Sequence, residues 1–281
     1  MDLIIPQQYE HTDMNKPIDE VFSNILMQAA VKNNILEFAQ GYLKRKGWFH
    51  SLNGSPCDAS GPIPWYTYPA ISFLTRIIRP EFKVFEYGCG NSTLWWAQMV
   101  NHVYSVEHNR GWYEEIRKKV PTNANLSYVG ENSPLPPPTT HLSDFNTFKQ
   151  LGLDLPISEN HDHNIYHGLV NDQFQAYALE ITKHAHQSFD VIIIDGMARA
   201  FSAFLADKHL KNSGILIFDN ANRWQYNSIF DYLGSMGHRR VDFYGPGPVS
   251  KKEWSTAIFI KDLSILEGTS TVPVGSGDLG W

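Results

Sequence analysis

Two short stretches in the middle of the chain carry the residues best suited to bind a small ligand. In the first, Val84-Phe-Glu-Tyr-Gly-Cys-Gly-Asn-Ser-Thr93, an apolar strand runs through Gly88 and Gly90 into a predicted helix. Such a turn brings backbone N–H groups to a ligand at the carboxyl edge of a parallel sheet. The second, His102-Val-Tyr-Ser-Val-Glu107, ends in an acid 21 residues after Glu86, placed to accept hydrogen bonds from ribose hydroxyls.

The charge of Glu86 predicts which nucleoside fits this turn. A nicotinamide dinucleotide would lay its pyrophosphate here, where a carboxylate repels it, whereas S-adenosylmethionine brings an ammonium and a sulfonium. The sequence therefore favours a methyl-donor site with Glu86 and Glu107 as its acids. A nicotinamide-dependent oxidoreductase is the alternative, although Thr93 stands where that fingerprint has a third glycine.

Two more apolar runs end in acids that are expected at the same edge of the sheet. Phe189-Asp-Val-Ile-Ile-Ile-Asp195 and Gly214-Ile-Leu-Ile-Phe-Asp219 have the composition of buried strands, and Asn220 follows the second directly. Methyl transfer is an in-line displacement, so the protein mainly has to align a nucleophile and exclude water. An alcohol acceptor still benefits from a base, and Asp195 is a candidate for that role.

Basic and histidine side chains near these acids leave several roles open. Arg199 and Arg223 follow the two acids, and they either clamp an anionic acceptor or form ion pairs with the acids. A histidine from the long segment after the third strand, His163 or His167, is a second candidate for the base. His161 and His163 have no identifiable third ligand, so this pair does not by itself predict a metal site.

An alternation of strands and helices must position these residues, and it predicts a parallel sheet covered on both faces. Strands are expected at Lys83–Tyr87, Val103–Glu107, Leu126–Val129, Val191–Asp195, Gly214–Asp219, Arg240–Tyr244 and Thr256–Ile260. Helices are expected at Ser92–Val100, Gly111–Val120, Asn171–His184, Ala198–Leu210 and Arg223–Met236. No helix separates the last two strands, so they are expected to pair as an antiparallel hairpin.

The whole chain is expected to form three parts. These are an N-terminal helical cap with an aromatic loop at 1–80, a donor-binding domain at 81–262 that contains a long loop or lid at 130–170, and a C-terminal tail at 263–281. The cap has helical periodicity from Pro17 to Gly47. In its aromatic loop, Gly61–Tyr68, Trp65 either borders the ligand site or plugs the core, and both interpretations stay open.

Composition limits the partners and the compartment. The chain has 281 residues, 42% of them hydrophobic, and its formal net charge of -6 disfavours binding to nucleic acid. The two cysteines, Cys57 and Cys89, have no zinc-site spacing, and no apolar run reaches membrane-spanning length. We therefore expect a cytoplasmic protein with a small-molecule acceptor, no nucleic-acid or membrane partner, and a homo-oligomer left open.

The order and spacing of these stretches resemble class I S-adenosylmethionine-dependent methyltransferases over about residues 82–261. The resemblance implies an α/β, Rossmann-like sheet of seven strands in the order 3-2-1-4-5-7-6, with strand seven antiparallel. It also implies S-adenosyl-L-methionine as cofactor. The residues that it places against the cofactor are Glu86, Gly88, Cys89, Gly90, Asn91, Ser92, Thr93, Glu107 and, at the adenine, Glu131 or Asn132.

Closer relatives differ in the catalytic residues that they imply. Asp195 with Asp219 and Asn220 resembles the magnesium site of catechol-type O-methyltransferases, so a divalent cation such as Mg²⁺ stays open. That family has a lysine base where this chain has Ala198, followed by Arg199, which stays protonated. The same strings resemble FkbM-type methyltransferases, which methylate hydroxyls. Asp195, Arg199, Asp219 and Asn220 are the catalytic candidates, and a non-catalytic binding module with this fold is the remaining alternative.

Overall fold

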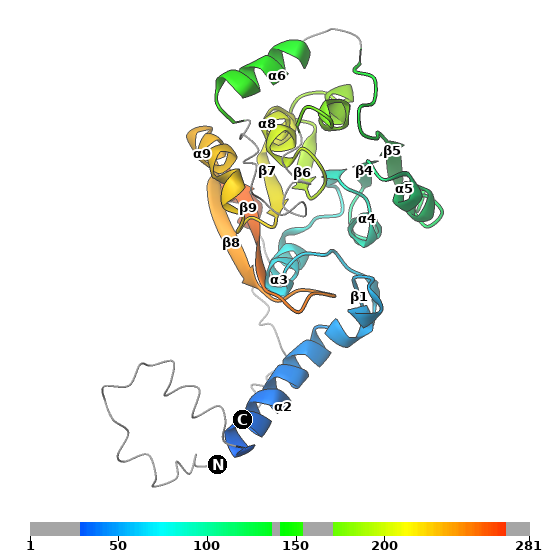
Figure 1. The fold of residues 1–281 in the computed structure, drawn as a ribbon, viewed down its shortest axis with the longest axis vertical. Helices are drawn as coiled ribbons and strands as arrows, with labels where there is room; N and C mark the ends of the chain where they lie inside the picture. Colours follow the sequence, from blue (N-terminus) through cyan, green and yellow to red (C-terminus); the bar gives the residue numbers. More distant parts are fainter. Residues whose placement is uncertain (1–28, 137–140, 154–170, 268–281) are drawn as a thin grey trace, which may run out of the picture.

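A seven-stranded sheet forms the centre of the computed structural model, which describes residues 29–136, 141–153 and 171–267 (Figure 1). The strands are β3 (Lys83–Tyr87), β4 (His102–Glu107), β5 (Ala124–Tyr128), β6 (Phe189–Ile194), β7 (Leu210–Asp219), β8 (Arg239–Gly245) and β9 (Trp254–Ile260). They lie in the order β5-β4-β3-β6-β7-β9-β8, which is 3-2-1-4-5-7-6 in chain order. Strand β9 runs antiparallel to β7 and β8, and the other pairs are parallel. The predicted fold class and the terminal hairpin are confirmed.

The central strands are apolar on both faces because helices cover both. Ile192 and Ile194 of β6 belong to one buried cluster, whereas Val191 and Ile193 belong to the other. This alternation follows from the two-residue period of a strand. The first cluster includes residues of α7 (Gln175–Ala178), α8 (Arg199–His209) and α9 (Asn227–Ser235), and the second includes residues of α3 (Tyr68–Ile77) and α4 (Asn91–Ala97). Helix α5 (Arg110–Ile116) connects β4 to β5.

Several predicted element boundaries were wrong. The helix expected at Asn171–His184 is the single turn α7 followed by the 3₁₀ helix η4 (Leu179–Lys183), where the Thr182 hydroxyl bonds the Leu179 carbonyl at 2.7 Å. Such a bond to a nearby carbonyl competes with regular α-helical pairing. The helix expected from Arg223 is divided into η5 (Trp224–Tyr226) and α9. Strand β7 begins directly after α8, four residues before the predicted Gly214.

Helix α6 (His141–Gln150) lies within the segment 130–170, where the sequence predicted no regular structure. It packs on the outside of α8, because Phe145 and Phe148 contact Phe201, and Lys208 bonds Asp144 at 2.6 Å (Figure 1). The three-residue spacing of the two α6 phenylalanines was the available signal for this helix. Residues 154–170, with His161, His163 and His167, lie outside the described residues, so the lid and the histidine base stay predictions.

The N-terminal part places aromatic residues beside the sheet. Helix α2 (Ala29–Arg45) projects away from the sheet (Figure 1). It is followed by the 3₁₀ helix η2 (Trp48–Asn53) and by the two-residue strands β1 (Cys57–Asp58) and β2 (Gly61–Pro62). The Trp48 indole donates to the Ser250 carbonyl at 3.0 Å, which ties this part to the loop between β8 and β9. The part of the predicted cap helix before residue 29 lies outside the described residues.

The chain returns to the domain after β9. The 3₁₀ helix η6 (Leu263–Leu266) buries Ile265, and the Arg79 guanidinium donates to the Glu267 carbonyl at 3.0 Å. The first residues of the predicted tail therefore pack on the domain, and 268–281 lie outside the described residues. None of the helices in the described ranges combines the length and the apolar character needed to cross a bilayer.

Candidate functional site

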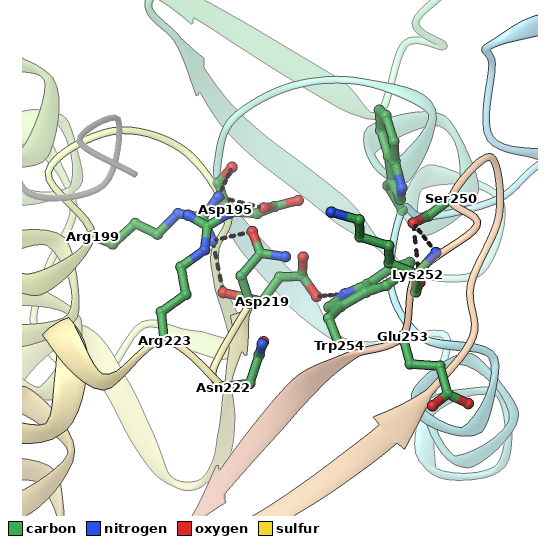
Figure 2. A pocket seen from close by; sticks show the side chains of 11 residues that line it. Asp195, Arg199, Asp219, Asn222, Arg223, Ser250, Lys252, Glu253 and Trp254 are labelled. Atoms are coloured by element: carbon green, nitrogen blue, oxygen red, sulfur yellow. Dashed lines mark hydrogen bonds and ion pairs between the residues drawn. The ribbon is translucent and has the colours of Figure 1, made fainter. Parts of the chain in front are cut away.

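Two cavities open at the carboxyl edge of the sheet, where the ends of β3, β4, β6 and β7 lie side by side. The first, of about 510 Å³, is here called the turn cavity and is lined by Gly88, Cys89, Glu107, His108, Asn109, Gly111, Trp112, Asp195 and Gly196. The second, of about 540 Å³, is called the arginine cavity and is lined by Trp65, Asp195, Arg199, Asp219, Asn220, Asn222, Arg223, Ser250, Lys252, Glu253 and Trp254 (Figure 2). Asp195 lines both cavities, so it marks the point where they meet.

The glycine turn needs Gly88 for a steric reason. Its φ is +96°, and a Cβ there would lie 3.1 Å from the backbone oxygen of Asp195. The Gly88 N–H donates to the Val106 carbonyl at 2.9 Å, so the turn is held against both neighbouring strands. Gly90 has an extended backbone, and a Cβ on it would meet no atom closer than 3.7 Å. Only Gly88 is therefore required by the geometry of the turn itself.

Glu107 is the most firmly held acid of the turn cavity. Its Oε2 accepts from the Cys89 N–H at 3.0 Å, and its Oε1 accepts from the N–H groups of His108 and Asn109 at 2.9 and 2.7 Å. Burial alone would raise the pKa of Glu107, but the His108 ring and these N–H donors outweigh burial and hold the pKa below its ordinary value. The carboxylate is therefore ionised at neutral pH, and its Oε2 keeps capacity for a further donor such as a hydroxyl.

Glu86 lies behind the turn rather than in the cavity wall. It is buried, its Oε2 accepts from the hydroxyls of Thr93 and Ser105, and its Oε1 meets no donor in good hydrogen-bond geometry among the described residues. Burial raises the pKa of Glu86 to about 7, although the hydroxyls of Ser92, Thr93 and Ser105 act in the opposite direction. A cation seated on the turn would favour the ionised form.

Replacing Glu86 by glutamine is expected to remove a pH-dependent cost from the folded protein. The ordinary pKa is 4.5 and the folded-state pKa is about 7, so the unfolded chain releases this proton first as pH rises. Glu86 should therefore contribute a fall of about 3 kcal/mol in wild-type stability across that window, and the Gln variant should lack this contribution. Urea unfolding of the ligand-free protein, below the ordinary pKa and above the folded-state pKa, measures this change in the free energy of unfolding. Exposed Glu131→Gln is the matched control, and an unchanged pH dependence in Glu86→Gln would refute the assignment.

Other residues predicted at the cofactor either make contacts within the turn or lie outside the lining of the turn cavity. Asn91 donates from Nδ2 to the Ser55 hydroxyl at 2.9 Å, which joins the turn to the N-terminal part. The Thr93 hydroxyl donates to Glu86 Oε2. Glu131 is exposed and lies outside the lining of the turn cavity, so its contact with adenine stays a prediction. The sequence also gave no reason to select Trp112, whose indole lines the cavity and bonds the Cys89 carbonyl.

The four catalytic candidates lie together around one guanidinium. Arg199 donates from Nη2 to Asp195 Oδ1 at 2.9 Å, and from Nη1 to the Asp219 carbonyl at 2.7 Å and to Asn220 Oδ1 at 3.2 Å (Figure 2). Of the two roles that the sequence left open for this arginine, the structure therefore shows the ion pair. The Asp219 carboxylate is turned the other way, where its Oδ1 accepts from Trp254 Nε1 at 2.9 Å.

The environment of Asp195 suits a group that exchanges a proton. Burial raises the pKa of Asp195 well above its ordinary value, the charge of Asp219 adds to this rise, and Arg199 opposes it. Burial also raises the pKa of Asp219. Two nearby carboxylates that titrate together share their apparent pKa values, so the pair rather than either residue will appear in a pH profile.

The same contacts do not fit the magnesium site that the resemblance left open. Arg199 holds an oxygen of Asp195 and the Asn220 Oδ1, and Trp254 and Thr256 hold the Asp219 carboxylate. A metal ion would have to displace a permanently charged guanidinium from the oxygens it needs. Among the described residues, no cluster of three or more His, Cys, Asp or Glu side chains could hold a metal ion.

The aromatic loop contributes one residue to the wall of the arginine cavity and one to the core. Trp65 is 46% exposed and lines the cavity, whereas its neighbour Tyr66 is fully buried. Tyr66 is thus the residue that fills the core, and Trp65 borders the arginine cavity. The cavity also includes Lys252 and Trp254, which the sequence pattern did not single out because they come from the strand β9 and the loop before it.

Comparisons with known proteins identify no family for this chain. No family model matches the sequence, and no curated protein matches it. Similar solved structures include a methyltransferase-like protein from Silicibacter pomeroyi (17% identity, covering 71% of this chain and 89% of that chain, TM-score 0.42). Others are a TehB-like SAM-dependent methyltransferase from Corynebacterium glutamicum (12%, 80% and 99%, 0.41) and a spermidine synthase from Thermotoga maritima (13%, 69% and 58%, 0.43). At these identities the likeness concerns the fold alone, and the relationships to FkbM-type and catechol-type enzymes stay predictions.

Proposed function

We propose that the chain is an S-adenosylmethionine-dependent methyltransferase that acts on a hydroxyl oxygen of a small-molecule acceptor. The observation that carries the proposal is the charge of the turn cavity. Glu107 and Asp195 line it, and the described residues of its wall include no lysine or arginine. Asp195 is paired with Arg199 of the neighbouring cavity, whereas no lysine or arginine among the described residues pairs with the ionised Glu107, whose charge favours a cationic ligand and opposes a diphosphate.

The residues of the turn cavity fit such a donor. Glu107 is ionised and keeps acceptor capacity on Oε2, which suits ribose hydroxyls. Gly88 allows a ligand to approach the backbone at the end of β3, and the cationic part of such a ligand would favour the ionised form of Glu86 behind the turn. When bound, S-adenosylmethionine supplies a methyl group on a positively charged sulfur that is already activated toward nucleophiles.

Asp195 is the base that we assign to the acceptor hydroxyl. It lies where the two cavities meet, so a hydroxyl in the arginine cavity can reach it from the side opposite the turn cavity. Its raised pKa makes the carboxylate a stronger base than an ordinary aspartate. Arg199 keeps its proton and fixes the orientation of Asp195 through the 2.9 Å contact. A cavity of about 540 Å³ has the size of a small-molecule site.

Calorimetry with the full-length protein tests the donor. We expect binding of S-adenosylmethionine and of S-adenosylhomocysteine, and no binding of NADH, because the ionised Glu107 of the turn cavity repels a diphosphate. Binding of NADH without binding of either sulfur nucleoside would replace the proposal with the oxidoreductase alternative. Donor binding without formation of S-adenosylhomocysteine in the presence of cell-extract metabolites would favour a non-catalytic module.

A further inference from the structure

The arginine cavity contains two cationic groups that make no direct contact with an acid among the described residues. Arg199 donates to Asp195, to the Asp219 carbonyl and to Asn220. Arg223 and Lys252 also line the cavity, and no hydrogen bond or ion pair joins either cationic group to another described residue, although the charge of Arg223 acts to lower the pKa of Asp195. An arginine and a lysine that face one cavity without a partner are the groups with which proteins bind carboxylates and phosphates.

The acidic residues of the cavity make no direct contact with these two cations. The Asp195 carboxylate is paired with Arg199, and hydrogen bonds from Trp254 and Thr256 hold the Asp219 carboxylate on the other side without removing its charge. Glu253 is exposed, and Figure 2 shows its carboxylate directed away from the space toward which the Lys252 side chain extends. The half-buried Arg223 is less screened by water than Lys252, so it should contribute the larger share of the binding free energy.

An apolar surface lies beside the two cations. The Trp65 indole lines the same cavity and is 46% exposed, which leaves a flat face available to a planar part of a ligand. Trp254 is buried, and its Nε1 is occupied by Asp219, so it contributes apolar wall rather than a donor. The cavity thus offers a cationic subsite and an aromatic wall, and Asp195 lies at its border with the turn cavity.

We propose that the acceptor is a small hydroxyl compound with one anionic group, a carboxylate or a phosphate, which Arg223 and Lys252 bind together. That the bound compound is methylated rests on the proposed function, whereas the binding of an anion by Arg223 and Lys252 does not. An anionic group bound by Arg223 and Lys252 leaves the hydroxyl end of the ligand to reach Asp195. The planar part then lies along Trp65.

Binding of matched ligands to the full-length protein, without any methyl donor, tests this assignment. The anionic probes are 4-hydroxybenzoate and phenyl phosphate, which separate a carboxylate source from a phosphate source. The neutral probe is 4-hydroxybenzamide, which has the size and ring of the benzoate. We expect at least one anionic probe to bind about tenfold more tightly than the amide, and this advantage to shrink as salt concentration rises.

Two substitutions locate the anion. Arg223→Gln should weaken binding of the preferred anion by about tenfold and Lys252→Gln by about threefold, and neither should change binding of the amide. Lys251→Gln is the matched control, because this exposed lysine is adjacent in sequence and does not line the cavity. Thermal unfolding of each variant identifies any that has lost its fold, and the salt dependence of the wild type tests the proposal without a variant.

Three results would overturn the proposal. These are equal binding of the anions and the amide, absence of binding by both anions, and an anion preference that survives both cavity substitutions. Because the probes are measured without a donor, failure here leaves the donor result untouched. Failure of S-adenosylmethionine to bind would in turn refute the proposed function and leave the anion site standing.

Discussion

Glu107→Gln is expected to weaken binding of S-adenosylhomocysteine by at least about 100-fold, which corresponds to about 3 kcal/mol. The wild-type carboxylate accepts three backbone N–H bonds from Cys89, His108 and Asn109 and, in the proposed complex, ribose hydroxyls as well. A glutamine has one acceptor oxygen and presents an N–H₂ group to the donors on its other side. At least one N–H then faces another donor, so both the ribose contacts and the shape of the turn are lost. Calorimetry of the purified variant measures the change.

The matched control for Glu107 is Glu114→Gln on the surface of α5. Glu114 forms an exposed pair with Arg117 at 3.5 Å and does not line the turn cavity, so its substitution should leave the dissociation constant unchanged. Equal affinity of wild type and Glu107→Gln would remove Glu107 from the binding site. Equal affinity would also remove the electrostatic argument that the ligand of this cavity is a sulfonium.

Asp195→Asn is expected to lower kcat by about 100-fold to 1000-fold while changing donor affinity much less. Asparagine keeps an oxygen to accept from Arg199, so the orientation of the cavity wall is preserved and the proton acceptor is removed. In the wild type, kcat/KM should rise with pH over a range above the ordinary aspartate pKa, because burial and Asp219 raise the pKa of Asp195 and only the ionised form accepts a proton. The Asn variant should lose this rising limb.

Single-turnover measurements against pH distinguish this role from a structural one. Asp172→Asn, which removes an exposed carboxylate that pairs with Lys149, should retain both the rate and the rising limb. Turnover should also persist in EDTA, since Arg199 holds oxygens that a magnesium ion would need. An Asp195→Asn variant with the wild-type pH profile would transfer the role of base to another group.

The hydrophobic pattern was sufficient to locate the strands of the sheet, although β7 begins four residues before its predicted start. Most buried strands are apolar runs that can be recognised without knowing their neighbours, even where a polar residue such as Glu86 or Ser105 lies within the strand. The acids Glu107 and Asp195 come at the ends of parallel strands, and the carboxyl ends of parallel strands meet at one edge. The pattern was weaker where local bonds decide helix type, as at Thr182, and where few apolar residues mark a helix, as in α6.

The chain on its own thus determined the class of fold, because the periods of strands and helices can be recognised locally, and the strand order that brings Glu107 and Asp195 to one edge was implied by the family resemblance. Only the tertiary structure decided which polar groups are already paired. Asp219 meets Trp254 and Thr256, residues 35 and 37 positions away, and the arginine cavity brings Trp65 to the same space as Lys252. Such contacts depend on distances between elements that are remote in sequence, and these distances cannot be derived from a local pattern of residue types. For this reason the sequence left an anion clamp and ion pairs equally open for the two arginines, and left a metal site open beside them, whereas the folded chain pairs Arg199 with Asp195 and places Arg223 and Lys252 in the wall of the cavity.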